Sequence, residues 1–209
     1  MAKYFNFFPK ILYTSDTISG DVVNNLTSRF SFEEGFKNNT SVCYEYDIQD
    51  SDTPEIIAAK FYGDSERHWI VLMFNDITDP QFDWPMDYRT LIAFMDEKYK
   101  DNANTNQSGS NWAQSHVHSY YKVETRTTLS TNTIVVNKFE VDSNTYSTIT
   151  TTSNDVLLAS NKTIRIQISK QTQSHYDYEM ELNESKRKIK LLKPEFVNNI
   201  ESEFRRVIA

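Results

Sequence analysis

The sequence predicts an α+β fold, in which amphipathic helices, a small antiparallel β-rich insert and a C-terminal helix follow one another along the chain. Capped helical patterns dominate residues 53–99, short β-branched runs between polar turns dominate residues 117–170, and an apolar stripe at helical spacing runs through residues 194–207. Helical and β patterns that occupy separate stretches of chain are typical of α+β proteins.

The composition supports a folded core and excludes several classes of partner. Thirteen Phe, twelve Tyr and three Trp among 209 residues supply large apolar areas for burial. The formal net charge is −7 and no stretch concentrates Lys and Arg over several helical turns, so we expect no nucleic-acid binding. No apolar run approaches the roughly 18 to 20 residues that span a bilayer, and the interrupted N-terminus resembles no signal peptide, so we expect no membrane association.

Residues 1–100 carry most of the aromatic and helical signal and are expected to form an N-terminal arm followed by a helical domain. The segment from Tyr4 to Tyr13 is expected to be extended, with apolar side chains that favour contact with other surfaces. The segment from Asp16 to Phe32 is expected to contain a short helix around Val22. Alternating residues from Ser41 to Ile48 predict a strand.

Three helices are expected after this strand. The first is capped by Thr53, has Pro54 at its first position and stops at Gly63. The second covers Glu66–Asn75 and is apolar on nearly all sides, which implies burial on most of them. The third begins at Pro85–Asp87 and runs to Tyr99 with one apolar face.

The rest of the chain divides into three further regions by composition. Residues 101–115 are rich in Asn, Gln and Ser and predict a linker, and residues 116–185 predict a β-rich Ser/Thr/Asn insert. The stretch 125–155 has few large apolar residues, so disorder is an open alternative there. Residues 186–209 predict a basic strand followed by an amphipathic helix from Pro194 to Val207.

Two stretches of the helical domain carry a resemblance to known families. Residues 46–64, which include a Thr53-Pro54-Glu55 helix start and a Tyr62-Gly63-Asp64 stop, resemble the opening strand and first helix of a LysM module, and residues 68–80 resemble its second helix and Asn-containing turn. Together with Asp79-Pro80 and Trp84, these motifs resemble the baseplate wedge protein 53 family of T-even-type contractile-tailed phages. The resemblance extends to Tyr99 and resumes weakly over residues 187–207.

The resemblance implies a non-enzymatic structural subunit of a phage tail baseplate. Such a subunit docks onto other wedge proteins, helps neighbouring wedges join around the hub, and is assembled into the virion tail in the host cytoplasm. Peptidoglycan-binding LysM modules complete their sheet with a second strand directly after the second helix, whereas here Phe82–Met86 leads into another helix. The alternative function, binding of cell-wall glycan by the LysM-like core, is therefore the less favoured one.

Residue types suited to catalysis or metal binding are present but incomplete. His116 and His118 share one side of a strand without a third ligand nearby in sequence, so we expect no metal site. Cys43 has no evident base partner, and a buried or interfacial thiol is the simpler interpretation. No phosphate loop, nucleophile elbow or dinucleotide motif occurs, so we expect no enzyme, no cofactor and no small-molecule substrate.

The candidate docking residues are large apolar side chains near the two ends of the chain, together with one tryptophan. So many apolar groups near a terminus must be covered by something, and a partner protein is one cover. Trp69, Phe74 and Trp84 are interpreted mainly as core, with an exposed docking face as the alternative. The candidates are Tyr4, Phe5, Phe7, Phe8, Trp84, Phe196, Ile200 and Phe204.

Overall fold

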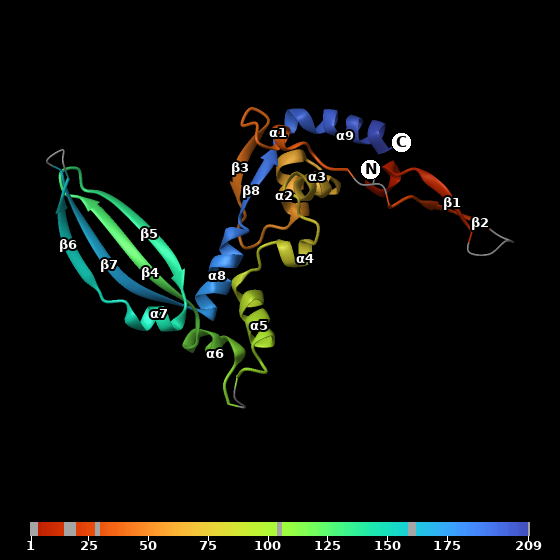
Figure 1. Ribbon diagram of the computed structural model, residues 1–209. Helices are drawn as coiled ribbons and strands as arrows, with labels where there is room; N and C mark the ends of the chain where they lie inside the picture. The colour runs from red at the N-terminus through yellow and green to blue at the C-terminus, as the bar shows by residue number, and fades with distance from the viewer. Residues whose placement is uncertain (1–3, 15–19, 28–29, 104–105, 159–161, 209) are drawn as a thin grey trace. The chain divides into compact units, whose positions relative to one another are not determined.

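The computed structural model describes residues 4–14, 20–27, 30–103, 106–158 and 162–208 (Figure 1). Helices and small antiparallel sheets are both present in this part of the chain, which confirms the predicted α+β class. The chain divides into two compact units, each described separately below. Unit 1 combines residues 1–87 with 184–209, and unit 2 comprises residues 88–183.

Unit 1 begins with a short 3-10 turn, η1 (Tyr4–Phe7), and an antiparallel ribbon of β1 (Lys10–Thr14) and β2 (Gly20–Asn24). The helix predicted around Val22 is wrong, because Val22 and Val23 lie in β2 and pair with Leu12 and Ile11. Adjacent β-branched residues favour a strand once a partner strand is available. Residues 15–19 and 28–29 of the predicted helical segment lie outside the described residues.

The next elements agree with their sequence signals. After α1 (Glu34–Lys37) comes β3 (Cys43–Asp47), within the strand predicted for residues 41–48. In α2 (Pro54–Tyr62), the Thr53 hydroxyl accepts a hydrogen bond from the Ile56 amide at 3.3 Å. Gly63 ends the helix with φ of 73°, a left-handed conformation that favours glycine. The predicted start and stop of this helix are confirmed.

The remaining elements of unit 1 come from both parts of its sequence. The second predicted helix forms as η2 and α3, and the terminal strand and helix form as β8 and α9. The elements are η2 (Ser65–Arg67), α3 (His68–Phe74), α4 (Pro80–Asp83), β8 (Lys188–Leu192) and α9 (Pro194–Ile208).

Strands β3 and β8 pair antiparallel and form a two-stranded sheet, seen side by side in Figure 1. The sequence predicts no second strand directly after α3, and α4 indeed follows there. The sheet nevertheless gains its second strand from β8, which begins more than a hundred residues later. The β-α-α-β order of this sheet and its two helices is therefore completed by the C-terminal part of the chain.

The core of unit 1 lies between this sheet, α2, α3 and α9. Its largest fully covered side chains come from the two helices α2 and α3, from β8 and from α9. They are Ile57, Ile70, Val71, Phe74, Leu191, Leu192, Val197 and Phe204. Trp69 is 5% exposed and Phe74 2%, so the interpretation of both as core residues is confirmed.

Among the residues that the structure describes, unit 2 has four helices and a four-stranded antiparallel sheet in the order β5-β4-β7-β6. The runs 133–136 and 163–168, predicted to be strands, lie in β5 and β7, and residues 125–155 form strands and a helix within unit 2. The elements are α5 (Tyr88–Lys98), α6 (Gly109–Ser115), β4 (Val117–Thr128), β5 (Thr133–Val141), α7 (Ser143–Thr148), β6 (Thr152–Leu157), β7 (Thr163–Ser174) and α8 (His175–Ser185).

Three helices of this region differ from the sequence predictions, and one of them is α7, which lies within the predicted β-rich insert. Residues 109–115 form α6 where the composition predicts a linker. Ser108 caps the start of this helix by accepting a hydrogen bond from the Asn111 amide, and Gly109 packs closely on the backbone of α5. Residues 175–185 form α8 where the sequence predicts β structure. Glu179 of α8 is buried and accepts hydrogen bonds from Lys98 Nζ at 2.6 Å and from the Tyr99 hydroxyl at 2.8 Å. Contacts with α5 thus stabilise α8.

Candidate docking site

A groove of about 940 Å³ opens on unit 1 between the N-terminal aromatic segment and α3. Its apolar lining includes Tyr4 and Phe5 of η1, Phe30, and Trp69, Leu72 and Met73 of α3. The helix α3 was predicted to be buried on most sides because it is apolar nearly all round. Trp69, Ile70, Val71 and Phe74 are indeed buried, whereas Leu72 and Met73 remain half-exposed at the groove.

Aromatic contacts hold the N-terminal segment in place on one side of this groove. The ring of Tyr4 lies 5.4 Å from that of Trp69 and 5.5 Å from that of Phe204, and the rings of Trp69 and Phe204 are 4.7 Å apart. The guanidinium of Arg205 lies 4.6 Å from the centre of the Phe7 ring. These ring and cation–π contacts give the segment a defined position on α3 and α9. Phe5 stays 56% exposed.

Two carboxylates line the apolar groove. Asp76 accepts a hydrogen bond from the buried ammonium of Lys37, which also pairs with Glu34. The hydrogen bonds to Asp76 and Glu34 raise the pKa of Lys37 above its ordinary value. Glu66 forms no ion pair with any residue that the structure describes. The groove therefore offers an apolar floor and one uncompensated negative charge to a bound segment.

The predicted docking residues do not all remain accessible. Phe8 and Phe204 are 7% and 0% exposed, so the chain itself covers them. The half-buried Trp84 donates a hydrogen bond from Nε1 to the Asp52 carbonyl oxygen at 3.0 Å. Tyr4, Phe7, Phe196 and Ile200 are partly buried and pack against the core. Among these candidates, Phe5 offers the most open apolar side chain, and docking through this set stays a prediction.

The sequence did not single out Phe30, Leu72 and Met73 as groove residues. Phe30 lay within a segment assigned to a helix, and Leu72 and Met73 belonged to a helix that was expected to be covered on most sides. The sequence feature that could have indicated a groove was the uniform apolarity of α3. A short helix at the edge of a small core cannot bury every side, so some of its apolar side chains must remain exposed.

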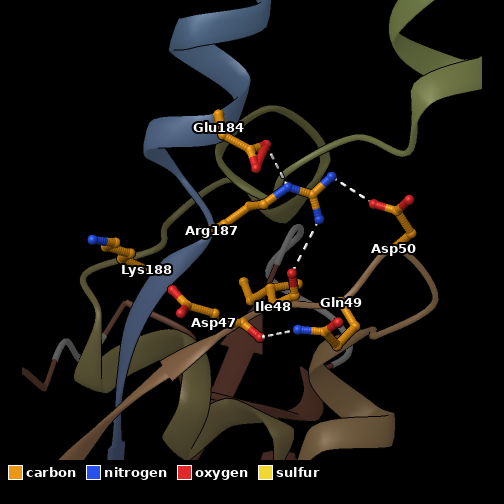
Figure 2. Close-up of a pocket in the computed structure, with 7 residues that line it drawn as sticks. All are labelled: Asp47, Ile48, Gln49, Asp50, Glu184, Arg187 and Lys188. Atoms are coloured by element: carbon orange, nitrogen blue, oxygen red, sulfur yellow. Dashed lines mark hydrogen bonds and ion pairs between the residues drawn. The ribbon is translucent and has the colours of Figure 1, made fainter.

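A second, polar cleft of about 670 Å³ lies where β3 ends and β8 begins (Figure 2). The Arg187 guanidinium donates to Glu184 at 2.7 Å, to Asp50 at 2.5 Å and to the Ile48 carbonyl oxygen at 3.0 Å. Each of the three guanidinium nitrogens thus donates a hydrogen bond to an acceptor in this chain. Arg187 thus joins the end of β3 to the start of β8, and its charge is compensated by the two carboxylates.

The histidines of unit 2 form an aromatic cluster. His116 and His118, the pair noted in the sequence, are joined by His175 of α8. The His118 ring stacks on Tyr178 at 3.9 Å and meets His175 edge-on at 4.9 Å, and the His116 ring stacks on Trp112 at 4.2 Å. Within the described ranges, no three His, Cys, Asp or Glu side chains are arranged to hold a metal ion.

Neither Cys43 nor the helices indicate another kind of site. The Cys43 thiol is buried, with Sγ 3.4 Å from the Asn39 carbonyl oxygen, so of the two interpretations, buried or interfacial, the structure favours the buried thiol. In the part of the chain that the structure describes, no helix is long and apolar enough to cross a membrane.

An α+β chain with an open aromatic groove on one unit has the features of a structural subunit. The family described as "Base plate wedge protein 53" matches residues 3–207. The chain therefore belongs to the base plate wedge protein 53 family and is a structural component of the phage tail baseplate. The chain is also similar to "Baseplate wedge protein gp53" of Enterobacteria phage T4, with 28% identity over 106 residues. That match covers 46% of this chain and 52% of the relative, about half the length of each.

Proposed function

We propose that this subunit docks onto other wedge proteins of the baseplate and helps adjacent wedges join around the hub. The observation that carries the proposal is the groove between η1 and α3, where Phe5, Leu72 and Met73 leave apolar surface uncovered. Uncovered apolar surface of this kind favours binding to another protein.

The ribbon of β1 and β2 supports the same proposal. Leu12 and Val22 lie opposite each other and are 68% and 66% exposed, and Tyr13 is 59% exposed. An isolated two-stranded ribbon is marginally stable in water. A neighbouring subunit that covers these side chains would stabilise the ribbon. Glycan binding gains no support from the comparisons, since the matched family and relative are both described as baseplate wedge proteins.

The test is complementation of a phage whose copy of this gene is inactivated, with variants of the full chain supplied in trans. Phe5→Asp places a charge on the exposed groove residue, and Phe82→Asp is the matched control because Phe82 is 55% exposed. We expect Phe5→Asp to lower the yield of complete baseplates at least tenfold, as seen by electron microscopy, and Phe82→Asp to leave it within twofold.

Two results would contradict the proposal. Complete baseplates formed without any copy of this chain would show that it has no role in joining wedges. Equal yields with Phe5→Asp and Phe82→Asp would show that the groove is not the docking surface. Circular dichroism of both purified variants controls for folding.

A further inference from the structure

The two edges of the β3-β8 sheet differ in what covers their backbone. Asn75, at the end of α3, donates from Nδ2 to the Lys190 carbonyl oxygen at 2.8 Å and accepts from the Lys190 amide at Oδ1 at 2.8 Å. The side-chain amide of Asn75 thus takes the place of a neighbouring strand at the outer edge of β8. An additional strand cannot pair there without displacing it.

The outer edge of β3 has free backbone groups. In an antiparallel pair, successive residues direct their backbone polar groups alternately toward and away from the partner strand. The Ile48 amide donates to the Arg187 carbonyl oxygen at 2.9 Å, and the Lys193 amide donates to the Val42 carbonyl oxygen at 2.9 Å. The backbone amide and carbonyl groups of every second residue of β3 therefore point toward β8, and these residues are Val42, Tyr44, Tyr46 and Ile48. The backbone amide and carbonyl groups of Glu45, whose register partner is Lys190, must then point away from β8.

Glu45 is consequently the centre of an open edge. Its amide and carbonyl groups have no hydrogen-bond partner among the residues that the structure describes. The Asp47 carbonyl oxygen, at one end of the edge, accepts from Gln49 Nε2 at 2.9 Å, a bond drawn in Figure 2. An edge strand with free groups is a template for another strand, a mode of recognition known as β-augmentation.

The charges on this sheet define what kind of strand fits. Glu45 and Asp47 share one face of β3 and are exposed, and their register partners on β8 are Lys190 and Lys188. Across this face of the sheet, β8 carries the lysines and β3, the strand at the open edge, carries the carboxylates. Opposite charges on directly facing residues stabilise a strand pair, and like charges destabilise it. On a third strand added beside β3, basic side chains at the positions opposite Glu45 and Asp47 would therefore stabilise the pairing.

The same rule excludes a second copy of β3 as the occupant. Antiparallel pairing of two β3 edges about Glu45 would place Glu45 of one copy directly opposite Glu45 of the other, with Asp47 opposite Cys43. On the opposite face of the sheet, the rings of Tyr44 and Tyr46 lie 5.7 Å and 5.2 Å from that of Phe61, which gives an aromatic surface. A strand that alternates basic and apolar residues matches both faces.

We propose that the open edge of β3 binds an extended segment of another tail protein, in which Lys or Arg alternates with apolar residues. The segment adds a third strand to the β3-β8 sheet beside Glu45. The inference rests on the proposed role as a docking subunit and names one docking surface and the chemistry of its partner.

The first test uses the full chain and a synthetic probe, acetyl-Thr-Lys-Val-Lys-Val-Lys-Thr-amide. In the free protein, we expect amide hydrogen exchange measured by NMR to be fast at Glu45 and Asp47 and slow at Tyr44 and Tyr46, which face β8. The peptide should slow exchange at Glu45 and Asp47 at least tenfold. Unchanged exchange at these two amides in the presence of saturating peptide would overturn the proposal.

Matched variants separate strand pairing from simple charge attraction. A peptide with Glu in place of Lys, a peptide with methylated backbone nitrogens, and the Glu45→Lys/Asp47→Lys variant should each weaken binding at least tenfold in calorimetric titrations. Glu55→Lys, an exposed change on α2, should change the affinity less than twofold. Equal binding of the methylated peptide would overturn the proposal, because such a peptide cannot pair with an edge.

The second test compares Glu45 exchange in the free chain and in assembled tails. Protection of Glu45 in tails supports the inference. If Glu45 exchanges as fast in tails as in the free chain, the edge is not used in the particle. That result leaves the groove as a docking surface, because the complementation test with Phe5→Asp reports on the groove separately.

Discussion

Gly109 of α6 lies against the backbone of Asp96 in α5, where a Cβ at position 109 would come within 2.6 Å of the Asp96 carbonyl oxygen and 2.7 Å of the Met95 carbonyl oxygen. The Ser110 amide also donates to Asp96 Oδ1 at 2.8 Å. The absence of a side chain at Gly109 therefore allows α6 to pack directly on α5.

We expect Gly109→Ala to destabilise the protein by about 1–3 kcal/mol, because the backbone of α5 must move to admit the methyl group. Gly35→Ala is the matched control, since nothing lies within 4 Å of a Cβ there. Its effect should be neutral or stabilising by up to about 1 kcal/mol. Urea denaturation followed by circular dichroism measures both, and equal effects would contradict the close packing.

Asn75→Ala should also lower the free energy of unfolding. Asn75 Nδ2 donates to the Val71 and Lys190 carbonyl oxygens, both at 2.8 Å, and Oδ1 accepts from the Lys190 amide. Loss of three partly buried hydrogen bonds should cost about 2–4 kcal/mol. Asn38→Ala removes an exposed acceptor from the side chain of the same lysine and should cost less than about 1 kcal/mol. Comparable losses from the two substitutions would count against this account.

Tyr46 predicts a dependence of stability on alkaline pH. Its hydroxyl donates to the Asp52 carboxylate at 2.5 Å, and this bond, together with burial, raises the pKa of Tyr46 to about 12. A pKa above the ordinary value of 10.0 means that the bond stabilises the fold fully below pH 10 and less as pH rises toward 12. Tyr46→Phe should therefore be less stable than the natural chain at pH 8, and the difference should shrink by pH 12. A constant difference in urea denaturation would disprove the assignment.

His175 predicts a dependence on mildly acidic pH. Burial lowers the pKa of His175 below its ordinary 6.5, and neighbouring His118, His116 and Lys98 lower it further, while Glu179 acts in the opposite direction. The folded protein thus favours neutral His175, and its contribution to stability falls as pH drops below about 6.5.

The test is to compare the natural chain with His175→Phe, which keeps a ring in contact with Trp112 and Tyr99. We expect the natural chain to lose stability relative to the variant between pH 7 and pH 5 in urea denaturation. Parallel pH profiles for the two proteins would show that His175 does not titrate as its surroundings suggest.

Local sequence signals predicted the elements whose causes are themselves local. Thr53 and Gly63 bound α2 as expected because capping and left-handed backbone geometry depend on a few adjacent residues. The apolar stripe of residues 194–207 formed α9 for the same kind of reason. By contrast, Val22 entered a strand because of its partner Leu12, which no pattern within residues 16–32 reveals.

The candidate site was predictable in part. The aromatic segment at the N-terminus was identified as a docking candidate, and Tyr4 and Phe5 do line the groove. Which rings would be covered by the chain itself could not be deduced, because Phe8 and Phe204 become buried through contacts with residues nearly two hundred positions away. The family resemblance, carried by residues 46–99, was confirmed by the match over residues 3–207.

The sequence alone determined the α+β class, the capped helix α2 and the terminal helix α9, because each depends on patterns among residues close together in the chain. It also indicated the base plate wedge family, through motifs within residues 46–99. Only the tertiary structure decided that β8 completes the sheet of β3, that Asn75 occupies one edge of this sheet, and that Glu45 lies at the open one. These outcomes depend on contacts between residues more than a hundred positions apart, whose pairing is selected by the packing of the whole core.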